Sequence, residues 1–270
     1  MLINTIILFL RDALPIFVIS TILISLLQHQ GIKPIWYFIA AGVSVIFSVF
    51  LLTAIDDISH TIDSTGREWL YACLYIICYF IALVLLMQLP KTQGQLSTRQ
   101  HWHICLCAGS LMVIVMTLNS ANFLIYITGY WFQNNASNVL VAGVILGGGI
   151  CASIAVLLYF LMAFIERYCR VIAQFLLIFF SAGLLMKATN LLIQIDILSS
   201  ERFLWDSNHI IIENSELGQL LTVFVGYDAT PTMLQLLLYL SAIFIAFGLM
   251  FLPTFISKQS RTITLPKEAA

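Results

Sequence analysis

Seven long apolar blocks dominate the sequence and limit what the chain can fold into. Each reaches the roughly 20 apolar residues that a helix needs to cross a bilayer. They cover residues about 3–27, 34–55, 69–89, 104–130, 139–164, 171–195 and 232–256. Charged residues form only 9% of the chain, against roughly 25% in globular proteins. The sequence therefore predicts an all-α polytopic membrane protein with seven transmembrane helices in a single domain (residues 1–270), and it excludes a soluble enzyme and a nucleic-acid binder.

Basic residues are distributed unevenly between the predicted loops, which sets the expected orientation. Loops on one side of the membrane hold Lys33, Lys91, Arg99, Arg167, Arg170, Lys258, Arg261 and Lys267. The other side holds Arg67 and Arg202. Because basic loops stay on the cytoplasmic side, we expect an integral protein of a bacterial inner membrane with its N-terminus outside and its C-terminus in the cytoplasm.

Arg11 and Asp12 lie near the middle of the first predicted span. A charge at the centre of a bilayer costs about 2.5–3.5 kcal/mol on insertion scales, so such residues are functional candidates. Pro15 follows one turn later and frees the carbonyl group of Arg11. Lys187, in the sixth span, is a further buried cation that needs a partner.

A second polar patch lies in the fourth span, where Asn119 and Asn122 are spaced i, i+3. Spans 1–3 and 4–6 are odd-numbered triplets and run in opposite directions, so polar patches in spans 1 and 4 meet near the midplane. This is the layout of an inverted-repeat transporter, here two inverted three-helix repeats plus a final helix. The alternative is that these amides only bond to neighbouring helices.

An acidic segment connects the second and third spans, and it carries Asp56, Asp57, His60, Asp63 and Glu68. Carboxylate oxygens with one imidazole suit iron or manganese. These residues are therefore candidates for a first cation-capture site on the outer face. The alternative is a solvated acidic loop.

A short amphipathic piece (Leu217 to Val225) precedes the last span and predicts a partial helix or re-entrant elbow. After it, Gly226 permits a turn, and Pro231 is expected at the first position of the last helix. Tyr227 and Asp228 at this elbow are candidates to line a transport path. The alternative is a purely structural turn.

These residues resemble a known family, the high-affinity iron permeases, which are seven-span iron importers of bacteria and fungi that often act beside a separate ferroxidase. The family motif Arg-Glu-Gly-Leu-Glu occurs once in span 1 and once in span 4. Here the corresponding segments read Arg11-Asp12-Ala13-Leu14-Pro15 and Leu118-Asn119-Ser120-Ala121-Asn122. Of the four glutamates of the motifs, only Asp12 keeps a carboxylate.

Three further segments are similar to the family. They are Gly226-Tyr227-Asp228-Ala229-Thr230-Pro231 before the last span, Ser181-Ala182-Gly183-Leu184 in span 6 and Arg67-Glu68-Trp69-Leu70 at the start of span 3. The resemblance covers nearly the whole chain, including the number of spans and their orientation. It implies the fold of that family.

The resemblance also implies the function, which is import of iron or a related metal cation into the cytoplasm. Captured cations would pass from the acidic segment to Asp12 and the Asn119/Asn122 face, with Arg11 in a supporting role. Iron would be the transported substrate, and we expect no tightly bound cofactor.

The expected partners are membrane lipid and a ferroxidase or periplasmic iron-binding protein, and the chain is also compatible with an oligomer. No nucleic acid is expected. No catalytic motif is present, so the chain is not expected to be an enzyme. The alternative function is a non-transporting, degenerate paralogue that serves as a membrane anchor or assembly subunit of an iron-handling or redox complex.

Overall fold

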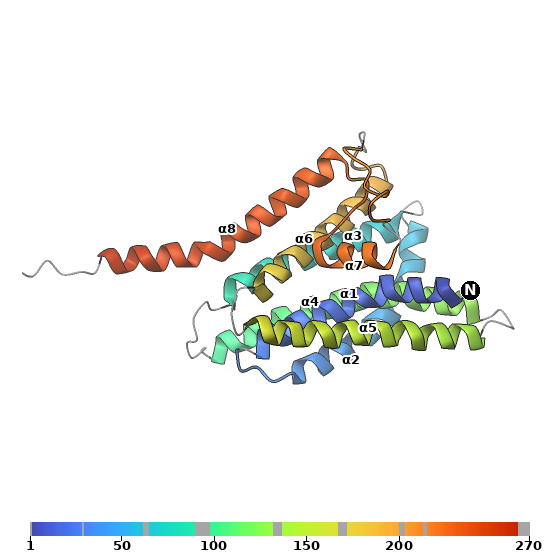
Figure 1. The fold of residues 1–270 in the computed structure, drawn as a ribbon, viewed down its shortest axis with the longest axis horizontal. Coiled ribbons are helices and arrows are strands. Elements are labelled where there is room, and N and C mark those ends of the chain that lie inside the picture. Colours follow the sequence, from blue (N-terminus) through green and yellow to red (C-terminus); the bar gives the residue numbers. More distant parts are fainter. Residues whose placement is uncertain are drawn as a thin grey trace, which may run out of the picture.

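The fold is helical throughout the part of the chain that the computed structural model describes, residues 2–28, 30–61, 65–89, 98–131, 137–166, 172–199, 203–212 and 215–263. Its helices (Figure 1) are α1 (Leu2–Gln28), α2 (Ile35–Thr61), α3 (Gly66–Gln88), α4 (Thr98–Trp131), α5 (Ser137–Glu166), α6 (Ile172–Gln194), α7 (Glu216–Val225) and α8 (Met233–Ile263). Seven of them, all except α7, are long and apolar enough to cross a membrane, which confirms the predicted number of spans. Within these ranges the β-structure is limited to an isolated bridge between Phe203 and Thr232.

Large apolar side chains point outward from the long helices. Phe38 in α2 is 72% exposed, Leu157 in α5 is 70% exposed and Phe244 in α8 is 73% exposed. Soluble monomers rarely carry extended surfaces of this kind, whereas lipid tails solvate them well. The arrangement is that of a polytopic membrane protein.

The long helices pair across the two halves of the chain rather than along it. The closest pairs are α1 with α5, α2 with α4, and α3 with α6. Suppose that α1, α2 and α3 trade places with α4, α5 and α6, respectively. The α1–α5 pair then becomes the α4–α2 pair, and the α3–α6 pair stays the same. Within the described residues, neither α1 with α2 nor α4 with α5 forms such a pair. This exchange agrees with two inverted three-helix repeats followed by α8.

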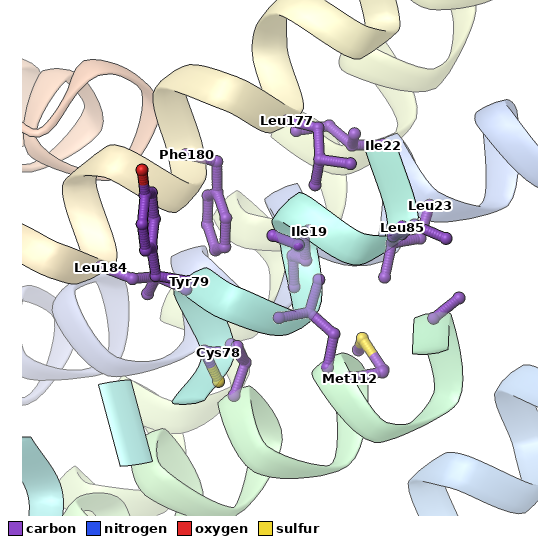
Figure 2. Close-up of a cluster of buried hydrophobic side chains, with 14 of the residues drawn as sticks. Ile19, Ile22, Leu23, Cys78, Tyr79, Leu85, Met112, Leu177, Phe180 and Leu184 are labelled. Carbon is purple, nitrogen blue, oxygen red and sulfur yellow. The ribbon is translucent and has the colours of Figure 1, made fainter. Parts of the chain in front are cut away.

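A common apolar core joins α1, α3, α4 and α6 (Figure 2). Its fully buried members include Ile19, Ile22, Leu23, Cys78, Leu85, Met112, Leu177 and Leu184. Ile19 lies seven residues after Asp12, so the two share a face of α1. The core therefore holds this side of α1 against α4 and α6.

The predicted partial helix before the last span is α7, which packs against α6 and α1. Ser215 caps its first turn, because its hydroxyl accepts a hydrogen bond from the Gly218 backbone N–H at 3.1 Å. Gly226 ends it at a φ of 70°, where a side chain would be strained. The Gly226 backbone rests directly on Gly183, halfway along α6.

The last helix begins at Met233, so the expectation that Pro231 is its first residue is wrong. Thr232 and Gln235 form a capping box instead. The Thr232 N–H donates to the Gln235 side chain at 2.6 Å, and the Gln235 N–H donates to the Thr232 hydroxyl at 3.4 Å. This reciprocal cap places Pro231 just outside the helix. From there α8 runs away from the other helices toward its C-terminal end (Figure 1).

Candidate functional site

Asp12 is a buried carboxylate in a helix that is otherwise apolar at this level. Its side chain is 6% exposed, and its Oδ1 atom lies 3.2 Å from Nε of Arg11. The Arg11 side chain is 60% exposed, so the pair joins one buried and one accessible group. The other carboxylate oxygen, Oδ2, is buried and has no hydrogen-bond partner among the described residues. Such an oxygen has lost its water without gaining a donor, which is costly.

A polar cavity of about 390 Å³ lies between α3 and α6, at the end of the bundle where α3 begins and α6 ends. We call this cavity the vestibule. It is lined by Arg67, Glu68, Tyr71, Tyr75, Lys187, Asn190, Leu191 and Gln194. Except for Leu191, these side chains carry polar atoms. The vestibule is thus a polar recess within an apolar bundle.

Helical spacing explains how α3 and α6 line the vestibule. Arg67, Tyr71 and Tyr75 follow one another at i, i+4 on α3, so they share a face. Lys187, Asn190 and Gln194 share a face of α6 in the same way. With a rise of 1.5 Å per residue, Tyr75 lies about 14 Å inside the start of α3. The vestibule therefore extends well into the predicted span.

Asp12 does not line the vestibule, but it lies within electrostatic range of two residues that do. The charges of Lys187 and Arg67 act on its carboxylate in addition to that of Arg11. Lys187 is the innermost vestibule residue on α6, and its Nζ atom lies 5.9 Å from the centroid of the Tyr75 ring. The expected partner for this half-buried cation is thus provided by Asp12, through space, and by an aromatic face.

The second polar patch is buried, but its described hydrogen bond is local. Asn119 is 3% exposed, and its Nδ2 donates to the Val115 carbonyl at 2.7 Å within α4. The side chain of Asn122 lies outside the described residues. One neighbour of the patch does reach another helix, because the Thr117 hydroxyl donates to the Ser44 carbonyl of α2 at 3.5 Å. Asn119 itself bonds within α4, so this hydrogen bond supports neither a transport path nor a bond to a neighbouring helix.

The acidic segment between the second and third spans is only partly described. The α2 backbone continues through Asp56, Asp57 and His60, so His60 does not lie in a loop as expected. The side chains of these three residues, and all of Asp63, lie outside the described part. Glu68 belongs to the first turn of α3 and lines the vestibule. Of the expected capture residues, Glu68 is the one whose side chain is described, and it lies at a cavity.

The two elbow candidates lie in different surroundings. The Tyr227 hydroxyl lies 2.7 Å from Oγ of Ser207 and 3.1 Å from the Ile211 carbonyl oxygen, so it braces the preceding loop. Asp228 accepts hydrogen bonds from the Thr230 N–H at 3.0 Å and from Nε2 of Gln235 at 3.4 Å. The structural alternative therefore accounts for Tyr227.

Asp228 also lines a second cavity of about 240 Å³ that shares Asn190 and Gln194 with the vestibule. A hydrogen bond from Gln235 of α8 to the Asn190 side chain of α6 joins two residues that line this second cavity. The elbow thus lies beside the vestibule, and Asn190 and Gln194 of α6 border both cavities.

Several vestibule residues were not predicted from the sequence, namely Tyr71, Tyr75, Asn190 and Gln194. Their helical spacing from Arg67 and Lys187 is visible in the sequence, but only the pairing of α3 with α6 brings the two faces together.

A cluster of three or more His, Cys, Asp or Glu side chains that could hold a metal ion is absent from the described residues. Comparison with protein-family models, curated proteins and solved structures finds no match to this chain.

Proposed function

We propose that the protein is a membrane transporter whose path begins in the vestibule and continues to Asp12. The observation that carries this proposal is the buried Oδ2 atom of Asp12, which has no donor among the described residues and lies within electrostatic range of the vestibule residues Arg67 and Lys187. An ionisable residue inside a membrane protein is expensive and commonly belongs to a substrate pathway. The exchanged pairing of the two helix triplets supports the same proposal, because inverted-repeat transporters bind substrate between their halves.

The cargo that follows from the resemblance to iron permeases is iron or a related metal cation, moving from outside to the cytoplasm. The predicted orientation places the vestibule on the outer side, where Glu68 and the acidic residues before it would attract cations. Asp12 would then receive the cation at the inner end. Arg11, Arg67 and Lys187 oppose this attraction, so we expect transport of a metal only when its charge is partly compensated by a ligand.

Uptake into proteoliposomes tests this function. The wild-type chain should accumulate radioactive iron, or a solute from a panel of metal ions and small organic ions, above empty liposomes. Asp12→Asn, which keeps the shape and removes the charge, should lower the initial uptake rate at least about tenfold, as expected for a lost charge interaction of roughly 1.5–3 kcal/mol. Asp196→Asn is the matched control, because Asp196 is an exposed carboxylate outside the vestibule. Equal rates for the wild type and Asp12→Asn would refute the path.

A second candidate is a subunit or anchor for an iron-handling or redox complex, with a ferroxidase or periplasmic iron-binding protein as the expected partner. The observation that favours it is the hydrogen bond from Asn119 to the backbone of its own helix, which takes this amide away from a cargo. Mild purification distinguishes the two functions. A stoichiometric partner together with no uptake of any panel member supports the subunit.

A further inference from the structure

The vestibule has the size of a small-molecule site and an unusual balance of charges. Its volume of about 390 Å³ falls within the range of ligand pockets. Two cationic side chains, Arg67 and Lys187, line it together with one carboxylate, Glu68. At neutral pH the lining therefore carries one excess positive charge, which attracts an anionic group rather than a bare cation.

The two cations are ordered along the vestibule by successive aromatic rings of α3. The Arg67 guanidinium carbon lies 5.3 Å from the centroid of the Tyr71 ring, and the Lys187 ammonium lies 5.9 Å from the centroid of the Tyr75 ring. Because Tyr71 and Tyr75 are one helical turn apart, the two cations lie at neighbouring positions along the same cavity. Two cations placed in this way suit one carboxylate, which a guanidinium binds through two parallel hydrogen bonds.

Lys187 keeps donor capacity for such a group. Across the described ranges no carboxylate lies within ion-pair distance of its ammonium, and the ion pair of Asp12 is formed with Arg11. Asp12 and Arg11 act on Lys187 only from a greater distance. On the α3 side, the facing groups are Tyr71, Tyr75 and Glu68.

An orphaned polar atom defines the rest of the ligand. Oε2 of Glu68 is buried at the vestibule without a hydrogen-bond partner among the described residues. An ionised carboxylate only accepts hydrogen bonds, so Oε2 calls for a donor from the ligand. The same carboxylate repels a second negative charge. The amides of Asn190 and Gln194 offer further donors and acceptors on the α6 wall.

We propose that the vestibule binds a small monocarboxylate that also carries a hydroxyl or amino group, with its carboxylate between Arg67 and Lys187 and its donor on Glu68. This binding is independent of transport, so it can be measured without a membrane gradient. A hydroxy acid and an amino acid share the chemistry that the vestibule recognises.

Calorimetric titration of the purified full-length chain tests the ligand class. The probes are lactate and alanine, propionate (a carboxylate without the donor), glycerol (donors without a carboxylate) and inorganic phosphate. We expect lactate or alanine to bind saturably and about 10- to 100-fold more tightly than propionate, glycerol or phosphate, as the loss of a charged hydrogen bond implies. The proposal would be overturned if neither lactate nor alanine binds saturably, or if phosphate binds as tightly as they do.

Substitutions test the residues. Arg67→Gln and Lys187→Gln should each weaken binding about 10- to 100-fold, and Glu68→Gln should reduce the preference for the better of lactate and alanine over propionate. Arg99→Gln is the control, because Arg99 is an exposed cation at the start of α4, outside the vestibule. Gel filtration and melting temperature verify folding, and Arg67→Gln carries the test if Lys187→Gln does not fold. Unchanged affinity in a folded Arg67→Gln would refute the assignment, whereas absence of iron uptake would not.

Discussion

Gly226 lies directly against Gly183, so that a Cβ atom on Gly226 would come within 2.8 Å of the Gly183 Cα atom. This contact joins the end of the short helix α7 to the middle of α6. Four residues farther along α6 lies Lys187, so the same face of α6 holds both α7 and the inner end of the vestibule. The position of the elbow and the geometry of the vestibule are therefore linked.

Gly226→Ala should destabilise the protein. The left-handed backbone alone costs about 1–2 kcal/mol for a residue with a Cβ atom, and the clash with Gly183 adds to this. We expect a lower melting temperature of the detergent-solubilised protein. Gly248→Ala is the control, because nothing lies within 4 Å of a Cβ atom there. Equal melting temperatures for the two variants would show that the contact is not tight.

Tyr79→Phe should weaken the attachment of α8 to the bundle. The Tyr79 hydroxyl donates to the Ala242 carbonyl at 2.9 Å, and this bond connects α3 with α8. Its loss should cost about 0.5–1.5 kcal/mol of unfolding free energy. Ser241→Ala removes a hydroxyl whose described hydrogen bond goes to the Leu238 carbonyl within α8, and it should be close to neutral. Chemical denaturation in micelles measures both, and a neutral Tyr79→Phe would contradict the expectation.

Thr232→Ala should remove the cap at the start of α8. Loss of an N-cap hydroxyl typically costs about 1 kcal/mol. Thr230→Ala is a matched control two residues earlier, because there the backbone N–H makes the bond to Asp228 and survives the substitution. A melting temperature that falls for Thr230→Ala as much as for Thr232→Ala would show that the cap is not the cause.

Asn119→Ala should leave uptake within a few-fold of the wild type, whichever panel solute is transported. The Asn119 amide donates within its own helix, whereas the Asp12 Oδ2 atom has no donor in the described part of the chain. Asp12→Ala, measured in the same proteoliposomes, should abolish uptake. Equal loss of activity in both variants would place the Asn119 amide in the path, as the resemblance to iron permeases implies.

The number of spans could be predicted because a bilayer imposes one length on every crossing helix. The helix ends could not be predicted as well. The second apolar block ends near residue 55, yet α2 continues to Thr61 through Asp56 and Asp57. Acidic side chains end an apolar surface without ending a helix, since they disrupt no backbone hydrogen bond. Pro231 was misplaced because the hydroxyl of Thr232 gives the helix a better start.

The candidate site could be predicted in part, on the basis of charge. Asp12 and Lys187 stand out in the sequence because each is costly in lipid, and the structure places Lys187 in the lining of the vestibule and Asp12 within electrostatic range of it. Tyr71 and Gln194 carry no such signal, since tyrosine and glutamine are common at helix surfaces. Their role depends on α3 and α6 lying side by side, which a single sequence does not state.

The crossed pairing of the helices has a consequence for biogenesis. During synthesis α1 leaves the ribosome long before α5, its main packing partner, because α1 ends at Gln28 and α5 begins at Ser137. At 5–20 residues per second, the interval is roughly 5–20 s. Over that interval α1, with its Arg11–Asp12 pair, lies in lipid or against the insertion machinery without α5. A nascent chain stalled before α5 should therefore be a preferred target of membrane quality control.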